Sequence, residues 1–112
     1  MTPAPPRILF LDDELAVLRG LERALRPTRR EWECRFVDDP VDALQVVDTF
    51  QPDAVVSDML MPGLDGAEFL SEASRRQPVM ARIILSGEVG AGSLARMAAS
   101  AHQCLAKPCR AE

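Results

Sequence analysis

The chain has 112 residues, of which 47% are hydrophobic and 27% are charged, the usual proportions of one globular domain. No apolar run approaches the roughly 20 residues that a membrane helix requires, and a formal net charge of -4 with scattered arginines gives no basic stripe for nucleic acid. We therefore exclude membrane insertion and direct nucleic-acid binding. We expect a cytoplasmic protein with reduced thiols, a flexible leader at residues 1–6 and one domain at residues 7–112.

The hydrophobic pattern predicts strands and helices in strict alternation. Short apolar runs are typical of buried strands, and longer runs with apolar residues three and four positions apart are typical of amphipathic helices. In chain order the predicted elements are a strand at residues 7–11, a helix at 15–26, a strand at 32–37, a helix at 40–50, a strand at 54–57, a helix at 67–76, a strand at 81–85, a helix at 91–101 and a strand at 104–106.

Local signals indicate where the helices begin and which faces they bury. The first helix has its apolar face at Leu15, Leu18, Leu21 and Leu25. Asp39 followed by Pro40 is typical of an N-cap and a first helical residue, so the second helix is predicted to start there. The third helix is predicted to bury Phe69, Leu70 and Ala73.

Alternating strands and helices with apolar strands predict a parallel sheet covered by helices on both faces. In such sheets, ligands bind beyond the carboxyl ends of the strands. The polar residues that end the predicted strands are therefore expected to lie together at one edge. They are Asp12, Asp13, Asp58, Ser86 and Lys107.

This set of residues has the chemistry of a phosphate site. Three neighbouring carboxylates repel one another, and Mg²⁺, which prefers carboxylate, water and phosphate oxygens, would relieve that repulsion. Asp58 ends the central strand and is the candidate nucleophile toward phosphorus, while Asp12 and Asp13 are the candidate acids on the metal side. Ser86 is a candidate hydrogen-bond donor to a phosphoryl oxygen, and Lys107 is a candidate counter-charge.

Four segments together resemble a known family. ILFLDDE, VVSDMLMPGLDG, IILSG and CLAKP are similar, in order and spacing, to the motifs of the receiver domains of two-component response regulators. The resemblance implies a flavodoxin-like, doubly wound sheet of five parallel strands in the order 2-1-3-4-5. It also implies Mg²⁺-dependent phosphoryl transfer from a histidine kinase or phosphotransfer protein to Asp58. Asp13 would bind the metal directly, Asp12 through water, and the backbone carbonyl of Leu60 would complete the protein ligands.

The chain departs from that family pattern in two places. Cys104 stands three positions before Lys107, where the family usually has the aromatic residue of its switch. The sequence also ends at Glu112, where the family's fifth helix would begin, so we expect that helix to be missing or truncated.

Two expectations follow from the missing helix and its surroundings. Apolar side chains from among Ile8, Phe10 and Leu105 would be partly exposed, so we expect either a homodimer formed through that face or a longer parent chain that covers it. The context HQCLAKPC resembles receivers that precede HD-type output domains, which implies such a domain in a longer parent chain.

Three other functions are compatible with parts of the pattern. An aspartate-nucleophile phosphohydrolase would usually have a second acid two residues after the nucleophile, where this chain has Leu60. A receiver-like scaffold that is never phosphorylated is disfavoured by the complete set of acids and favoured by the missing aromatic residue. A Zn²⁺ site would have to use His102 and the three cysteines, Cys34, Cys104 and Cys109, which lack the paired spacing of zinc ligands.

Overall fold

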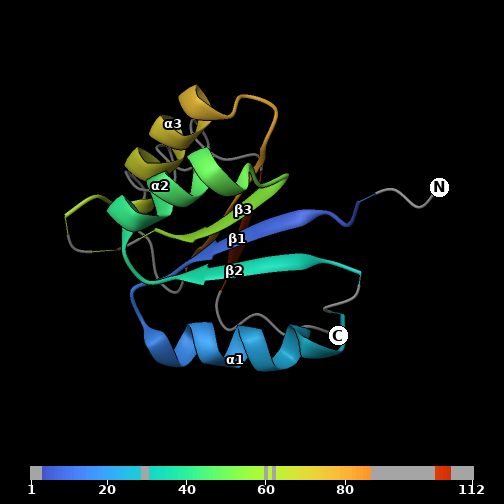
Figure 1. Ribbon diagram of the computed structural model, residues 1–112. Helices are drawn as coiled ribbons and strands as arrows, with labels where there is room; N and C mark the ends of the chain where they lie inside the picture. The colour runs from blue at the N-terminus through green and yellow to red at the C-terminus, as the bar shows by residue number, and fades with distance from the viewer. Residues whose placement is uncertain (1–3, 29–30, 60, 62, 87–102, 107–112) are drawn as a thin grey trace.

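The computed structural model describes residues 4–28, 31–59, 61, 63–86 and 103–106 (Figure 1). The elements are β1 (Arg7–Leu11), α1 (Leu15–Leu25), the 3₁₀ helix η1 (Arg26–Thr28), β2 (Glu33–Val37), α2 (Pro40–Phe50), β3 (Ala54–Asp58), α3 (Gly66–Arg76), β4 (Ala81–Ser86) and β5 (Gln103–Ala106). From β1 to β4 each strand is followed by a helix that precedes the next strand, as the sequence predicts.

The strands form one parallel sheet in the order β2-β1-β3-β4-β5. Helices α2 and α3 lie on one face of this sheet, and α1 lies on the other (Figure 1). The predicted doubly wound, flavodoxin-like α/β arrangement with strand order 2-1-3-4-5 is therefore confirmed.

The predicted bounds agree with the structure to within one residue where the structure describes them. Glu33 rather than Trp32 begins β2, Gly66 rather than Ala67 begins α3, and Gln103 rather than Cys104 begins β5. The helix predicted at residues 91–101 and the expected absence of a fifth helix both lie outside the described residues. Within the described part of the chain, no helix has the length and apolarity needed to cross a membrane.

Side-chain caps begin two of the helices. Asp39 precedes α2 and accepts a hydrogen bond from the backbone N–H of Asp42 at 3.0 Å, with Pro40 as the first helical residue. Asp65 precedes α3 and accepts from the backbone N–H of Glu68 at 2.9 Å. Each carboxylate satisfies an N–H that has no partner within its own helix, so the start predicted for α2 is confirmed.

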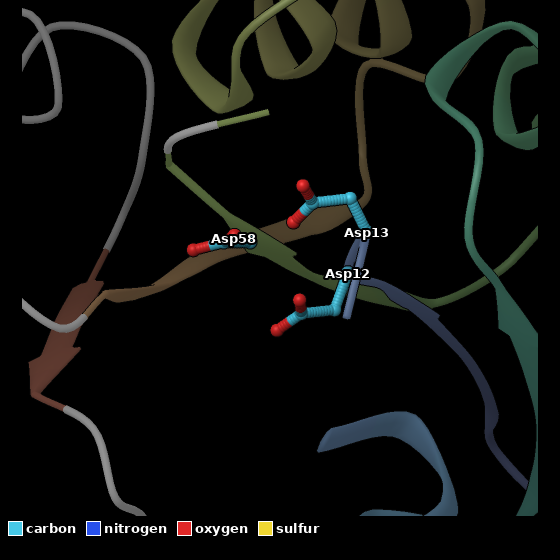
Figure 2. A group of neighbouring side chains, drawn as sticks. All are labelled: Asp12, Asp13 and Asp58. Atoms are coloured by element: carbon cyan, nitrogen blue, oxygen red, sulfur yellow. The ribbon is translucent and has the colours of Figure 1, made fainter. Parts of the chain in front are cut away.

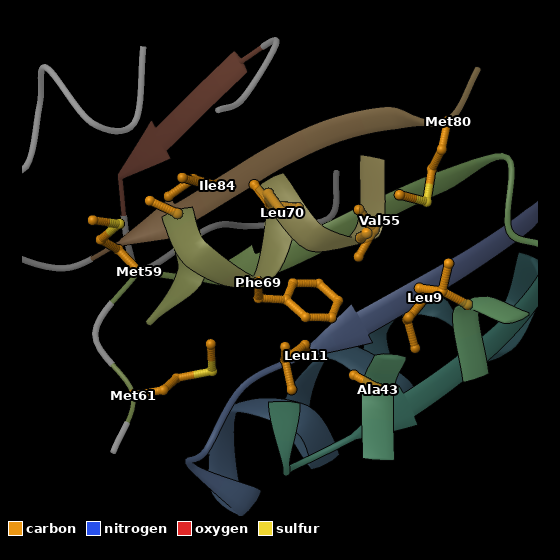
Figure 3. Packing of buried hydrophobic residues seen from close by; sticks show 13 residues of the cluster. Leu9, Leu11, Ala43, Val55, Met59, Met61, Phe69, Leu70, Met80 and Ile84 are labelled. Atoms are coloured by element: carbon orange, nitrogen blue, oxygen red, sulfur yellow. The ribbon is translucent and has the colours of Figure 1, made fainter. Parts of the chain in front are cut away.

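The hydrophobic core lies between the sheet and the helices α2 and α3. Strands β1, β3 and β4 contribute fully buried side chains that meet the buried faces of these two helices (Figure 3). The predicted inward residues of α3 are confirmed, because Phe69, Leu70 and Ala73 are completely buried. Helices α2 and α3 thus shield this face of the sheet from solvent along β1, β3 and β4.

The opposite face of the sheet is less completely covered. Leu18 of α1 is buried, but Leu15, which the spacing placed on the apolar face of the same helix, is 50% exposed. Phe10 is buried and its ring stacks on Phe36 at 5.0 Å between centroids, so the expectation that Phe10 would be partly exposed is wrong. Ile8 is partly exposed, as expected, and the side chain of Leu105 lies outside the description.

Hydrogen bonds at the amino ends of β1 and β3 hold these two strands together. The backbone N–H of Arg7 donates to Oδ2 of Asp53 at 2.8 Å, and the N–H of Asp53 donates to the carbonyl of Arg7 at 2.8 Å. The Arg7 guanidinium also donates to the carbonyl of Phe50 at 3.0 Å, at the end of α2. These contacts help to fix the register between β1 and β3, and this register determines which residues lie side by side at the carboxyl ends of the two strands.

We predict that Phe69→Ala lowers the free energy of unfolding by about 3–5 kcal/mol, because it leaves a cavity in the buried layer. Val79→Ala is the matched control, since Val79 is 92% exposed and its truncation should change stability by less than about 0.5 kcal/mol. Urea denaturation followed by circular dichroism measures both changes. Equal effects of the two substitutions would contradict this description of the core.

Candidate functional site

Asp58 is the last residue of β3, the middle strand of the sheet. Its neighbours in the sheet are β1 on one side and β4 on the other. The residue is only 6% exposed, so its carboxylate is held at the carboxyl edge in a largely buried position. Burial of a carboxylate is unfavourable unless neighbouring groups compensate its charge, which makes this position a candidate functional site.

Asp12 and Asp13 follow the end of β1 at the same edge. Leu11 pairs with Ser57 in the sheet register, which places Asp12 beside Asp58. Asp12 is 3% exposed, and its Oδ1 accepts a hydrogen bond from the backbone N–H of Glu14 at 2.9 Å. Asp13 is exposed. The pair therefore offers one buried, backbone-anchored carboxylate and one open carboxylate.

The three predicted acids form one cluster. Asp12, Asp13 and Asp58 each offer a carboxylate oxygen, and these atoms all lie within 4.8 Å of one another. Figure 2 shows the three carboxylates directed toward a common region from the ends of β1 and β3. Like charges at this separation repel, and a divalent cation that prefers oxygen ligands would relieve the repulsion. The donor set therefore fits a hard cation such as Mg²⁺.

The turn from β3 to α3 is closed by a backbone hydrogen bond. The N–H of Gly66 donates to the carbonyl of Met59 at 2.8 Å. Gly63, inside the turn, has a φ of 83°, a conformation that residues with a side chain rarely adopt. The turn thus brings the N-terminus of α3 back against the end of β3, directly beside Asp58.

Three other predicted site residues are described incompletely or not at all. The backbone of Ser86 ends β4, one residue beyond Leu85, which pairs with Asp58. Its side chain lies outside the description, as do Leu60 and Lys107 entirely. The structure therefore brings Asp12, Asp13 and Asp58 together, and the roles predicted for Ser86, Lys107 and the Leu60 carbonyl stay predictions.

The alternative Zn²⁺ site gains no support from the described residues. Burial raises the pKa of the Cys34 thiol, which disfavours the thiolate that zinc binds. The other three proposed ligands, His102, Cys104 and Cys109, have side chains outside the description.

A comparison with known protein families decides the identity of the domain. The profile of the family described as "Response regulator receiver domain" matches residues 8–112. The chain belongs to this family. The resemblance seen in its four sequence motifs is confirmed.

Individual relatives agree with the family assignment. The receiver domain is 35% identical over 97 residues to a protein-glutamate methylesterase/protein-glutamine glutaminase of Anaeromyxobacter dehalogenans, a match that covers 87% of this chain and 27% of the relative. It is 42% identical over 64 residues to the response regulator MprA of a Mycobacterium species, covering 57% of this chain and 27% of the relative. The receiver domain thus spans about a quarter of the length of these relatives.

A solved structure matches over almost the whole chain. The signal receiver domain of an HD domain-containing protein from Pseudomonas fluorescens Pf-5 superposes with a TM-score of 0.87 at 27% identity. The match covers 94% of this receiver domain and 84% of that chain.

Ser57, a direct neighbour of Asp58, was given no role by the sequence analysis. Ser57 is completely buried and its hydroxyl donates to the backbone carbonyl of Asp58 at 2.9 Å. Gly66 is another close neighbour, because the atoms nearest to a Cβ built on it belong to Asp58 and Met59. A serine directly before Asp58 was the available signal, although its strand position alone predicts only burial.

We predict that Asp13→Asn raises the free energy of unfolding by about 1 kcal/mol in the presence of EDTA, because it removes one of three mutually repelling charges. Thermal and urea unfolding of the metal-free protein measure the change. Glu22→Gln, which neutralises an exposed acid on α1 outside the cluster, is the control and should have a smaller effect. A destabilised Asp13→Asn protein would show that repulsion in the cluster is already compensated by other groups.

Proposed function

We propose that this receiver domain is the phosphoacceptor of a two-component signalling protein and that Asp58 carries the phosphoryl group. The observation that supports the proposal most directly is the cluster of three carboxylates at one sheet edge, with Asp58 buried at the end of the middle strand. Membership of the receiver family supports the same chemistry. In this proposal the domain is a signalling module and not an independent enzyme, although it assists its own phosphorylation and dephosphorylation.

The proposed reaction is a transfer from phosphohistidine to a carboxylate. An oxygen of Asp58 forms a bond to phosphorus while the phosphorus–nitrogen bond of the donor breaks, and the imidazole nitrogen keeps the bonding electron pair. The product is an acyl phosphate on Asp58. The low exposure of Asp58 supports this role because it limits the access of water to the product.

The residues that would hold Mg²⁺ are Asp12, Asp13 and Asp58, together with the Leu60 carbonyl. When bound, Mg²⁺ would supply positive charge that neutralises the phosphoryl oxygens during transfer. Asp12 is anchored by the Glu14 N–H, so it offers a fixed carboxylate, whereas exposed Asp13 can orient toward the ion. By family analogy we propose a direct contact for Asp13 and a water-mediated contact for Asp12.

Ser86 and Lys107 would complete the site on the side of β4 and β5. Ser86 follows the residue that pairs with Asp58, and it pairs in turn with Ala106, the residue before Lys107. This backbone placement supports a role for the Ser86 hydroxyl as a donor to a phosphoryl oxygen. The Lys107 ammonium would pair with another phosphoryl oxygen.

The partners follow from the same proposal. A histidine kinase or a phosphotransfer protein would supply the phosphoryl group. An output domain in a longer parent chain would receive the signal, and the structural likeness to a receiver from an HD domain-containing protein supports an HD-type output. The predicted homodimer also stays a proposal, supported by the partly exposed Ile8 on the α1 face of the sheet.

We predict that acetyl phosphate with Mg²⁺ adds one phosphoryl group to the wild-type protein and none to Asp58→Asn, since the amide is not a competent nucleophile. Intact mass spectrometry measures the adduct. Asp38→Asn is the matched control, because Asp38 is an exposed acid that follows β2 at the same edge and should leave the adduct unchanged. An adduct that persists in Asp58→Asn would reject the assignment.

We predict that Mg²⁺ affinity falls further in Asp13→Asn than in Asp12→Asn. Both substitutions remove one charge, but loss of a direct ligand should weaken binding more than loss of a water-mediated one, which typically costs roughly ten- to a hundredfold. Isothermal titration calorimetry measures both dissociation constants. Equal losses, or a larger loss in Asp12→Asn, would overturn the proposed division of roles.

A further inference from the structure

The backbone that follows Asp58 is held by hydrogen bonds to two successive carbonyl groups. The Ser57 hydroxyl donates to the Asp58 carbonyl at 2.9 Å, and the Gly66 N–H donates to the Met59 carbonyl at 2.8 Å. The Met59 side chain is completely buried in the core (Figure 3). The carbonyl groups of Asp58 and Met59 therefore both have fixed partners.

Gly66 adds a steric constraint to these hydrogen bonds. A Cβ placed on Gly66 would collide with the carbonyl oxygen of Asp58 and would lie 2.8 Å from the Cα of Met59. Both neighbours are backbone atoms of a central strand end, so they cannot rotate away as a flexible side chain would. The absence of a side chain at this position allows the first turn of α3 to rest directly on the backbone of Asp58.

Ser57 places a hydroxyl in a layer that is otherwise apolar. It pairs in the sheet with Leu11 and Ile84, which are 1% and 0% exposed, and is itself completely buried. A buried hydroxyl is unfavourable unless it is hydrogen-bonded, and here it binds the carbonyl of the proposed phosphoacceptor. Alanine would fill much of the same space without forming this hydrogen bond. Packing alone therefore does not account for the hydroxyl at this position.

We propose that Ser57 and Gly66 are positioning residues that fix the Asp58–Met59 peptide and thereby aim the Asp58 carboxylate into the acidic cluster. The inference rests on the proposed phosphoacceptor function. Side-chain direction depends on the backbone at the same residue, so a shift of the Asp58 carbonyl turns the carboxylate away from Asp12 and Asp13. Displacements of about 1 Å at a reacting group can cost roughly a hundredfold in rate.

The first test compares phosphorylation rates with acetyl phosphate at saturating Mg²⁺, each divided by the folded fraction from circular dichroism. Gly66→Ala should slow the reaction by roughly tenfold or more, and Ser57→Ala should slow it by about three- to tenfold because one hydrogen bond is lost. Gly20→Ala, where a Cβ meets nothing within 4 Å, and Ser74→Ala, whose hydroxyl donates to the Ser71 carbonyl on the surface, are the matched controls. Both should react at the wild-type rate.

A second comparison separates positioning from simple stabilisation. Ser57→Thr keeps the hydroxyl but adds a methyl group to a filled layer, so it should be less stable than wild type and yet react within about twofold of its rate. Rates that follow thermal stability across Ser57→Ala and Ser57→Thr would overturn the proposal. This comparison also decides the matter if Gly66→Ala does not fold.

A third measurement needs neither metal nor phosphodonor. In EDTA, hydrogen exchange of the Gly66 amide should be at least about threefold faster in Ser57→Ala than in wild type, because its acceptor, the Met59 carbonyl, directly follows the Asp58–Met59 peptide that has lost a partner. Unchanged exchange would overturn the proposal. A wild-type protein that gains no Mg²⁺-dependent phosphoryl adduct would reject the phosphoacceptor function itself. If the wild type is phosphorylated and the Ser57→Ala and Gly66→Ala proteins are phosphorylated at the same rate, only the positioning role is rejected.

Discussion

The parallel pairing of β1 with β3 is the constraint on which the site depends. Parallel strands bring their carboxyl ends to the same edge, and the register that pairs Leu11 with Ser57 sets Asp12 beside Asp58. The amino edge fixes this register through the two hydrogen bonds between Arg7 and Asp53. A slip of one residue would turn every side chain of a strand to the other face and separate the acids. The same pairing therefore serves both the core and the chemistry.

The site is stable only because the rest of the domain compensates for it. Asp12 and Asp58 are both buried and lie in one cluster with Asp13, an arrangement that opposes folding through desolvation and repulsion. The dense layer under α2 and α3 supplies the opposing hydrophobic stabilisation, and the Glu14 N–H binds Asp12 directly. Functional sites commonly contain groups that oppose folding. Among the residues that the structure describes, the buried acids Asp12 and Asp58 both lie at the carboxyl edge of the sheet.

Sequence reasoning predicted the features that follow from local pattern and from the geometry of parallel sheets. The start of α2 at Pro40 and the convergence of the three acids are of this kind. The strand order, by contrast, was implied by the resemblance to the receiver family. It was wrong about Phe10, whose burial depends on stacking with Phe36 from another strand, and it did not foresee the exposure of Leu15. Such outcomes depend on which tertiary neighbour covers a residue, and periodicity within one element contains no information about that.

The two glycines of the β3–α3 turn differ in what they would tolerate during evolution. Gly63 is required for its positive φ, and a Cβ there would meet nothing within 4 Å, so asparagine or aspartate, which enter this conformation more readily than other residues, are plausible replacements. Gly66 is required for space, and every other amino acid has a Cβ that meets the Asp58 backbone. Receiver sequences that retain this packing should therefore have glycine, asparagine or aspartate at the position of Gly63. At the position of Gly66 they should have only glycine.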